Sequence, residues 1–402
     1  MIKLEVVMKL IKKIKALLRK TLNFVMKRFG WLLPIDKKLI VFTAFHGRGY
    51  LDNPKYIHLQ MMKDERFKDY KTIWFVKKGT KIPGVKTINY LSLRYFYYVA
   101  RAKVWIFNCK MPTYLHKKSN QIYIQTWHGT PLKRLGCDIE TKEGQTFYRS
   151  KMSGQEMKET YRIDSAKYNY MISPSQFTTD VFPSAFDVAK ERLLEVGYPR
   201  NDILINYTQQ QVDDLKEQLH IPKDKKVLLY APTWRDNNFT AKGYQFELEV
   251  NFDLWKKYLS DDYVVLFKPH YLIVTKFDFS AYKGFVYNIP PTKDIAALYP
   301  LADVLVTDYS SVFFDYALMK RPIYFYMYDL DSYKDELRGF YIDIHQDLPG
   351  DIYESEEIML EAIKNEAFDY ERLETFSKRF NSNEDGKAAQ KILDVLYQDL
   401  KK

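Results

Sequence analysis

Short apolar runs alternate with helix-like segments from residue 38 to the C-terminus, and this alternation constrains the fold more than any other feature of the chain. Strands that alternate with helices predict parallel sheets, because a parallel crossover needs a connection of helix length. The runs form two series. The first is expected to form strands at Leu39–Phe45, Thr72–Val76, Val104–Phe107, Ile122–Thr126 and Tyr168–Ile172. The second is expected to form strands at Val227–Tyr230, Tyr263–Phe267, Phe285–Asn288, Val304–Thr307 and Ile323–Tyr326.

The segments between these strands carry helical spacing. Helices are expected at Asn53–Met62, Ser92–Ala102, Ser175–Phe186, Asp294–Pro300, Ser311–Met319 and Asp385–Leu400. A chain of 402 residues is too long for one ordinary core, and 46% hydrophobic with 28% charged residues is typical of a globular protein. We therefore predict an α/β protein with four parts: an N-terminal segment (1–34), two Rossmann-like domains (35–198 and 199–384) and a closing helix (385–402).

Positive charge is concentrated at the N-terminus. Residues 1–30 hold nine basic side chains and one acid, Glu5, so most of the net charge of +11 lies there. Apolar residues recur at steps of three and four between Val7 and Phe29, which predicts a basic amphipathic helix lying on an anionic membrane surface. The residues expected to contact the membrane are Lys12, Lys13, Lys20, Lys27, Arg28, Phe29 and Trp31. The alternatives are a first helix packed on the body and a helix that mediates self-association.

The rest of the chain excludes several classes of protein. Its body is nearly neutral, which argues against a nucleic-acid-binding surface. The chain contains no run of 18 apolar residues, so no transmembrane helix is predicted. Two cysteines, Cys109 and Cys137, are too few for a disulfide framework and favour a reducing, intracellular setting. The P-loop, dinucleotide-binding and zinc motifs are absent.

The loop after the fourth predicted strand carries a histidine. Ligands of parallel sheets bind at the carboxyl ends of the strands, so His128 at such an end is a candidate catalytic residue. Gly129 and Pro131 follow it, and Pro131 is expected near the start of a helix whose amides would bind the same anion. The alternative is a buried histidine bonded to a backbone carbonyl.

Three loops of the second series are also rich in polar side chains. Arg235 follows the strand 227–230 and is suited to a phosphate, or alternatively to an ion pair with Asp236. Lys268 and His270 follow the strand 263–267, where they are suited to charge on a phosphoryl group. Ser310 and Ser311 are expected to start a helix and bind an anion, or simply to cap it. From the residues alone we predict a basic, histidine-bearing cleft for a nucleotide-linked phosphate donor.

Six of these segments resemble one family. QTWHGTPLKRL (125–135), GYPRND (197–202), YAPTWRD (230–236), KPHYLI (268–273), TDYSSVFFDYA (307–317) and RGFY (338–341) are similar to the CDP-glycerol glycerophosphotransferases of teichoic acid synthesis. The likeness runs from about residue 40 to about residue 398. It implies a GT-B-type fold, with two Rossmann-like domains facing a cleft and the CDP donor mainly on the C-terminal domain. It also implies a peripheral enzyme at the cytoplasmic face of the membrane of a Gram-positive-type envelope, acting in cell wall biogenesis.

The resemblance assigns roles position by position. His128 matches the catalytic histidine, expected to act as general base on the acceptor hydroxyl, and His270 matches a second essential histidine at the donor diphosphate. The residues implied or expected to line the donor are Arg200, Thr233, Arg235, Lys268, Thr307, Asp308, Ser310 and Ser311. The residues expected on the acceptor side are Asn53, Lys55 and Lys133.

The implied reaction is phosphoryl transfer. An acceptor hydroxyl on a polyprenyl-diphosphate-linked saccharide, or on its glycerol-phosphate primer, attacks the β-phosphorus of CDP-glycerol, and CMP leaves. We expect no cofactor and no obligatory metal, and a homo-oligomer is possible. The alternatives are a CDP-ribitol-dependent transferase, a GT-B nucleotide-sugar glycosyltransferase and a non-catalytic binding protein. The absence of long extra segments favours an enzyme that adds one or a few units.

Overall fold

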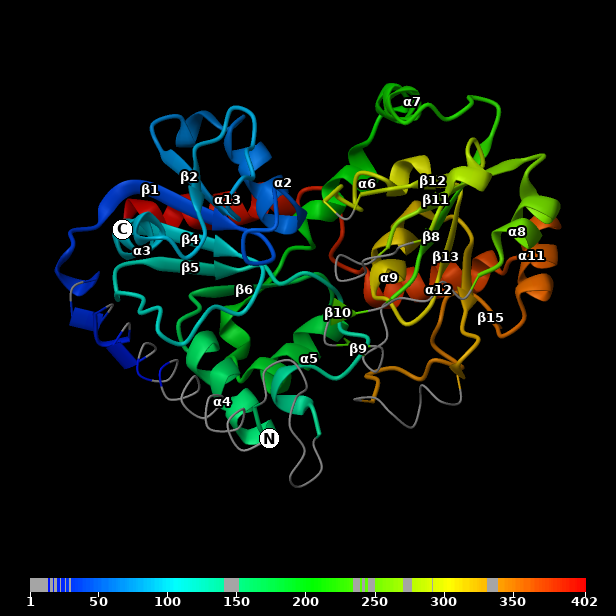
Figure 1. Cartoon of the computed structure of the whole chain (residues 1–402). Coiled ribbons are helices and arrows are strands. Elements are labelled where there is room, and N and C mark those ends of the chain that lie inside the picture. The colour runs from blue at the N-terminus through cyan, green and yellow to red at the C-terminus, as the bar shows by residue number, and fades with distance from the viewer. Residues whose placement is uncertain are drawn as a thin grey trace, which may run out of the picture. The chain divides into compact units, whose positions relative to one another are not determined.

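A computed structural model describes residues 14, 17, 20, 21, 23–25, 27, 28, 30–140, 152–233, 239, 240, 243, 244, 250–269, 277–290, 292–330 and 339–402. The chain forms two compact units, each built around a parallel sheet (Figure 1). Unit 1 comprises residues 1–128, 141–172 and 183–194, and unit 2 comprises 129–140, 173–182 and 195–402. The two units confirm the α/β class with two parallel-sheet domains.

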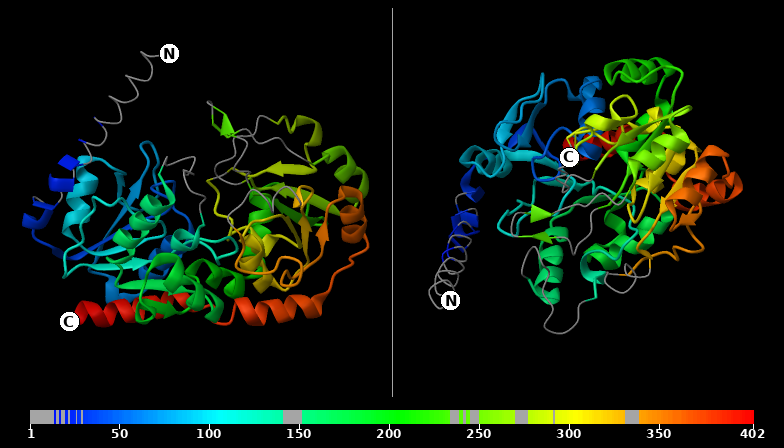
Figure 2. Two further views of the ribbon diagram at one scale, coloured as in Figure 1. Left: turned by 90° about the horizontal axis from the view of Figure 1, so that it is seen from below. Right: turned by 45° about the vertical axis from the view of Figure 1, so that its right-hand side comes forward.

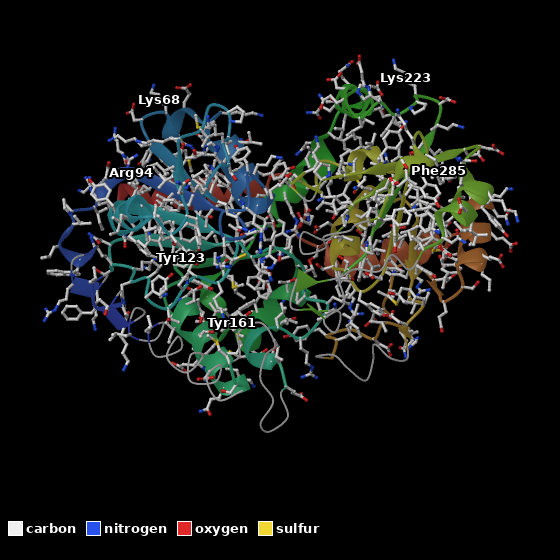
Figure 3. All side chains as sticks on the ribbon, viewed as in Figure 1. Lys68, Arg94, Tyr123, Tyr161, Lys223 and Phe285 are labelled. Atoms are coloured by element: carbon white, nitrogen blue, oxygen red, sulfur yellow. The ribbon has the colours of Figure 1, made fainter. Side chains whose placement is uncertain are left out.

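Unit 1 contains a sheet of seven strands in the order β3-β2-β1-β4-β5-β6-β7. The strands are β1 (Asp36–Thr43), β2 (Lys71–Val76), β3 (Thr87–Asn89), β4 (Ala102–Phe107), β5 (Ile122–Gln125), β6 (Tyr170–Ser173) and β7 (Leu193–Glu195). Its pairings are parallel, with Ile40 of β1 opposite both Thr72 and Val104. The sheet interior is aromatic: Trp74, Trp105 and Tyr123 are fully buried, whereas Lys68 lies at the surface (Figure 3).

Helices cover this sheet. They are α2 (Asp52–Met61), α3 (Leu93–Arg101) and α4 (Gly154–Ser165), with 3-10 turns at Glu65–Phe67 and Lys190–Arg192. The 3-10 turn Gly136–Asp138 belongs to unit 2, and α5 (Gln176–Phe186) begins in unit 2 and ends in unit 1. Their starts follow from local sequence. The hydroxyl of Ser92 accepts a hydrogen bond from the amide of Tyr95, and Ser153 with Glu156 forms a capping box.

Unit 2 contains a parallel sheet of six strands in the order β12-β11-β8-β13-β14-β15. The strands are β8 (Lys226–Ala231), β11 (Tyr263–Phe267), β12 (Val286–Asn288), β13 (Val304–Thr307), β14 (Ile323–Tyr326) and β15 (Ile352–Tyr353). A separate antiparallel pair is formed by β9 (Phe239–Thr240) and β10 (Gly243–Tyr244). β8 is central and pairs with β11 and β13, so the ends of these three strands lie together.

Helices surround the second sheet (Figure 2). The helices assigned to unit 2 are α6 (Asp202–Asn206), α7 (Gln209–Gln218), α8 (Phe252–Leu259), α9 (Val312–Tyr316), α11 (Glu356–Lys364), α12 (Tyr370–Phe380) and α13 (Ala388–Lys401). The 3-10 turns are Pro199–Asn201, Ser280–Tyr282, Tyr299–Leu301 and Ala317–Met319. Trp255 of α8 and Phe267 of β11 belong to one buried cluster.

All ten predicted strands are present, with ends within three residues of the expected positions. The helix expected at Asp294–Pro300 is wrong: the segment forms turns and then a 3-10 turn at Tyr299–Leu301. Pro300 has no amide hydrogen to donate to a carbonyl one turn back, so a regular helix cannot continue through it. The helix expected at Ser311–Met319 is shorter, because α9 gives way to a 3-10 turn that ends at Lys320 in the left-handed conformation.

The units differ from the predicted domain ranges, and the boundary expected after residue 198 lies after residue 194. Residues 129–140 and 173–182 belong with unit 2, and so does α13, which was expected to stand apart as a closing helix. The physical reason is contact with unit 2: two α13 amides, those of Ala388 and Ala389, donate to the carboxylate of Asp202.

Part of the N-terminal segment is described. Ile14, Leu17, Lys20, Thr21, Asn23–Val25, Lys27, Arg28 and Gly30–Leu32 have helical backbone. Lys12, Lys13 and Phe29 lie outside the described residues. None of the helices in the described part of the chain is both long and apolar enough to cross a membrane.

Candidate active site

His128 follows β5 at the carboxyl end of the unit 1 sheet. Its Nδ1 lies 2.6 Å from the backbone carbonyl oxygen of Asn108, and a carbonyl only accepts hydrogen bonds. Nδ1 therefore carries the hydrogen, and in the neutral ring Nε2 is the nitrogen that accepts a proton. This is the tautomer that a general base needs when its second nitrogen faces substrate.

A second histidine of the same unit shows what a structural histidine looks like. His58 is buried, with Nδ1 2.8 Å from the Tyr50 hydroxyl and Nε2 3.0 Å from Thr72 Oγ1. Burial lowers the pKa of His58 to about 4, so this ring stays neutral. His128 is only half-buried. Its carbonyl bond is the one that the structural alternative also predicted, so that bond alone does not decide between the two roles.

The surroundings of His128 are apolar. Its ring lies 4.2 Å from the Trp127 ring and 5.4 Å from the Phe45 ring, measured between centroids. Cys109 Sγ lies 4.0 Å from His128 Nδ1. Burial raises the pKa of the Cys109 thiol to about 12, so this thiol is neutral and no competing nucleophile.

Two of the three residues predicted on the acceptor side are in unit 1. Asn53 is fully buried, and its Nδ2 donates to the carbonyls of Thr126 and Trp127 at 3.2 and 3.1 Å. Asn53 therefore holds the backbone that leads into His128. Lys55 is half-buried, with Nζ 4.7 Å from the centre of the Tyr56 ring.

The helix expected after His128 is wrong. Residues 129–135 run without helix, and Lys133 forms an antiparallel bridge with Phe340. The amide of Arg134 donates to the Gly339 carbonyl at 3.0 Å, and the amide of Tyr341 donates to the Leu132 carbonyl at 2.9 Å. The loop is thus paired with residues 339–341 of the RGFY segment. These contacts satisfy backbone groups of the loop that a helix would have satisfied internally. No pattern in the residues indicated that these two motifs would pair.

Gly129 lies against the start of α9. A Cβ built on Gly129 would be 2.9 Å from Ser311 Oγ. Ser311 occupies the N-cap position of α9, yet its side chain makes no capping hydrogen bond, so the capping alternative for this serine is not found. Ser310 and Ser311 are both half-buried.

The ends of β8 and β13 are joined by polar contacts. Asp308 Oδ1 accepts hydrogen bonds from the Thr233 amide, at 2.8 Å, and from the Thr233 hydroxyl. The hydroxyl of Thr307 donates to the Ala231 carbonyl at 2.8 Å. Thr233, Thr307 and Asp308 are buried, so these contacts hold the ends of β8 and β13 together. Arg235 lies outside the described residues.

Lys268 follows β11 and is buried. Its Nζ donates to the Pro290 carbonyl at 3.1 Å. Burial lowers the pKa of Lys268 to about 8, although the Asp294 carboxylate acts in the opposite direction. An anion bound beside this ammonium would stabilise its charged form. His270 lies outside the described residues.

Arg200 is engaged in a buried ion pair. Its Nε and Nη2 donate to the two carboxylate oxygens of Asp315 at 2.9 and 3.0 Å, and both side chains are about 5% exposed. Asn201 donates to Asp315 and to Glu384, at 3.2 and 2.8 Å. Burial raises the pKa of Glu384 to about 8. This network joins GYPRND to α9, and sequence reasoning missed both acids because they lie more than 100 positions away.

The structure therefore brings the predicted residues together in two groups. In unit 1, Asn53 holds the backbone just before His128. In unit 2, Thr233 contacts Asp308, Gly129 lies close to Ser311, and Lys133 pairs with Phe340. Within the part of the chain that is described, no three His, Cys, Asp or Glu side chains are grouped to hold a metal ion.

Comparison with known proteins identifies the family. The model of the CDP-Glycerol:Poly(glycerophosphate) glycerophosphotransferase family matches residues 25–398. The chain is 41% identical over 380 residues to a teichoic acid poly(glycerol phosphate) polymerase of Staphylococcus epidermidis, which covers 91% of this chain but only 51% of that protein. It is 40% identical over 377 residues to a teichoic acid glycerol-phosphate transferase of Staphylococcus aureus, covering 90% of this chain and 94% of that protein.

More distant relatives and a solved structure complete the comparison. A teichoic acid poly(ribitol-phosphate) polymerase of Bacillus spizizenii is 29% identical over 371 residues, covering 91% of this chain and 57% of that protein. A solved structure of a variant of the wall teichoic acid polymerase TagF, soaked with CDPG, superposes with a TM-score of 0.87 at 38% identity, covering 98% of this chain and 97% of that one. Fold, motifs and matched length agree, and the chain belongs to the CDP-glycerol:poly(glycerophosphate) glycerophosphotransferase family.

Proposed function

We propose that this enzyme transfers glycerol phosphate from CDP-glycerol to a hydroxyl of a polyprenyl-diphosphate-linked saccharide, or of its glycerol-phosphate primer, and releases CMP. The observation that carries the proposal is that His128 is half-buried at a strand end while its Nδ1 is held by the Asn108 carbonyl. The bond to the carbonyl leaves the hydrogen on Nδ1 and makes Nε2 the basic nitrogen of the neutral ring, which is the tautomer that proton abstraction from an acceptor hydroxyl requires.

The donor is assigned to the strand ends of unit 2 in a GT-B-type arrangement. Lys268 supplies a buried ammonium, and Ser310 and Ser311 supply half-buried hydroxyls, for the donor phosphates. Arg235 and His270 complete this set in the proposal. The contacts of Thr233, Thr307 and Asp308 favour a positioning role for these three residues. The bidentate pair with Asp315 favours the same for Arg200.

In the reaction, His128 takes the proton of the acceptor hydroxyl as the oxygen attacks the β-phosphorus of CDP-glycerol. The bond from phosphorus to the bridging oxygen breaks, and CMP leaves with the electron pair. Cationic and hydroxyl groups at the strand ends stabilise charge on the phosphoryl oxygens and on CMP. The proposal includes no cofactor and no obligatory metal, and complete loss of activity with a chelator would contradict that part.

We propose glycerol, and not ribitol, as the polyol of the donor. The relatives named for glycerol phosphate are 40–41% identical to this chain, whereas the ribitol-phosphate polymerase is 29% identical. The chain spans about half the length of the Staphylococcus epidermidis polymerase but nearly the whole length of the Staphylococcus aureus transferase. We propose that it adds one or more glycerol-phosphate units, and the two acceptors of the test below distinguish these cases.

The proposed location is the cytoplasmic face of the membrane, with the N-terminal segment as anchor. Its described apolar side chains are turned to solvent: Leu17 is 66% exposed, Phe24 61%, Trp31 72% and Leu32 67%. Lys20, Lys27 and Arg28 are exposed in the same segment. A helix packed on the body would bury its apolar residues, so this exposure supports the membrane role.

The test is CMP release from CDP-glycerol, with CDP-ribitol and a UDP-sugar in parallel. The acceptor is a lipid-linked disaccharide with or without one glycerol phosphate. Release with the bare disaccharide identifies a primase, and release only with the primed acceptor identifies an extending enzyme. Turnover of CDP-ribitol alone, or of the UDP-sugar alone, would overturn the donor assignment. The His128→Ala variant is expected to lose turnover while it still binds CDP-glycerol.

A further inference from the structure

A buried polar network leads from α2 to His128. Asp52, the first residue of α2, is 6% exposed, and Asn53 and Asn108 are completely buried. None of the predicted catalytic roles uses Asp52 or Asn108. Buried carboxylates and amides are costly unless every polar group has a partner, so their arrangement requires an explanation.

Asp52 is the centre of this network. Its Oδ2 accepts a hydrogen bond from Asn108 Nδ2 at 3.2 Å, and its Oδ1 accepts one from the Asn53 amide at 2.6 Å. The two bonds lead in different directions, and each leads on to the loop that carries His128.

The first branch passes through Asn108. Its side chain is held at both ends, because Oδ1 accepts the Phe45 amide at 2.8 Å while Nδ2 donates to Asp52. The amide therefore cannot flip without losing both bonds. A fixed side chain fixes the backbone of Asn108, and its carbonyl is the group that lies 2.6 Å from His128 Nδ1.

The second branch passes through Asn53. Its Nδ2 donates to the carbonyls of Thr126 and Trp127, the two residues just before His128. One branch thus holds the imidazole ring, and the other holds the backbone from which the ring projects.

The backbone at this network is strained. Phe45, Asp52 and Trp127 all have positive φ, at 45°, 59° and 48°. Residues other than glycine occupy this region at a cost of about 1–3 kcal/mol each, and such strain persists where surrounding contacts impose it. All three residues take part in the network, through the Phe45 amide, the Asp52 carboxylate and the Trp127 carbonyl.

We propose that Asp52 and Asn108 are positioning residues for His128: together they fix the tautomer and the direction of its imidazole for proton abstraction from the acceptor. This inference rests on the proposed base role of His128. It deepens that role, because it names the groups through which the fold holds the base.

A swap of the two side chains tests the proposal. Asp52→Asn leaves one oxygen for two donors, Asn108 Nδ2 and the Asn53 amide, and Asn108→Asp places a carboxylate against the Asp52 carboxylate, so each single change removes a hydrogen bond of the network. The Asp52→Asn/Asn108→Asp double variant restores the bond between residues 52 and 108 in reverse. It also keeps an oxygen for the Phe45 amide and another for the Asn53 amide.

The single variants are expected to lower kcat for CMP release about 10- to 100-fold, while the KM for CDP-glycerol changes less than about twofold. In the parent, the carbonyl at Nδ1 favours the imidazolium of His128 over the neutral ring. A variant that displaces this carbonyl should favour the neutral ring, and the acidic limb of the kcat–pH profile should therefore move to lower pH. The double variant is expected to recover kcat to within about threefold of the parent, together with its pH profile.

Folding is measured on each variant by its melting temperature. Gln121→Leu is the matched control: Gln121 is a buried amide of the same unit that donates to the carbonyls of Val99 and Ala102. Its loss is expected to lower the melting temperature and leave kcat and the pH profile unchanged. If a swap variant does not fold, Asn53→Ser tests the second branch, with the same expected split between kcat and KM.

The outcomes separate the two levels of the proposal. Full turnover by the His128→Ala variant would contradict the proposed role of His128 as general base. Loss of turnover in His128→Ala, together with unchanged kcat and pH profile in folded Asp52→Asn and Asn108→Asp, would overturn the positioning role alone. A folded double variant no more active than the weaker single variant would also overturn it.

Discussion

Gly129 and Ser311 approach each other so closely that a side chain on residue 129 would displace the Ser311 hydroxyl. A Cβ at Gly129 would lie 2.9 Å from Ser311 Oγ and 3.7 Å from Ser311 Cβ. The residue after the proposed base is thus in contact with a residue proposed for the donor phosphates. The glycine of the WHGT motif is explained by this close approach, and not by the start of a helix.

Gly129→Ala is expected to displace the Ser311 hydroxyl. The methyl group cannot share the space with Oγ, and the shift costs about 1 kcal/mol of unfolding free energy because one torsion of Ser311 relieves the contact. We expect a larger effect on kcat/KM for CMP release than on the melting temperature. The Gly129→Ala/Ser311→Gly variant should recover the melting temperature but not the activity; recovery of both would show that the Ser311 hydroxyl has no role.

Arg200→Met separates a structural from a donor-binding role. Removal of one partner leaves the buried charge of Asp315 uncompensated, so unfolding free energy should fall by about 3–5 kcal/mol. Arg200→Met/Asp315→Leu removes both charges and should be less damaging than the single variant. We expect the Kd for CDP-glycerol of the folded double variant, measured by calorimetry, to stay near that of the parent. A rise of tenfold or more would mean that Arg200 binds the donor.

The lowered pKa of Lys268 leads to a prediction of how donor binding depends on pH. Burial lowers its pKa to about 8, from an ordinary value near 10.5, so the amine is charged at pH 7 and mostly neutral at pH 9. If the ammonium binds the donor phosphates, deprotonation removes the attraction, and the Kd for CDP-glycerol should rise about tenfold from pH 7 to pH 9. Lys268→Arg keeps its charge over this range and should abolish the rise. An identical pH dependence in that variant would assign the effect to another group.

Ten of the strands were predictable because each is a short apolar run, and their order placed His128 and Lys268 at strand ends. The strands β3, β7 and β15, which have two or three residues, were not predicted because they are too short to show a pattern. Contacts between distant segments were not predictable. Nothing in the residues near Asn53 indicates that its amide reaches the carbonyls of Thr126 and Trp127. The same holds for Arg200, whose guanidinium was expected at the donor but pairs with Asp315 at a separation of 115 positions. Local patterns specify elements, whereas the partners of buried polar groups depend on the complete fold.

The N-terminal segment is expected to bind anionic membranes through apolar contact and charge together. Trp31 and Leu32 are 72% and 67% exposed, and full burial of such side chains in a membrane interface contributes about 1.5–3 kcal/mol each. Trp31→Ala/Leu32→Ala should therefore reduce co-sedimentation with vesicles containing anionic lipid at least tenfold. Lys20→Glu/Lys27→Glu should weaken co-sedimentation more at low salt than at high salt, because salt screens charge and not apolar burial.

Asp69→Ala, on an exposed ion pair with Lys38, is the control and should sediment like the parent. Both double variants should keep CMP release with a water-soluble acceptor analogue, since neither touches the strand ends. Unchanged sedimentation of both double variants would contradict the membrane role. The exposed apolar residues would then be assigned to self-association, which a measurement of the mass of the protein in solution would show.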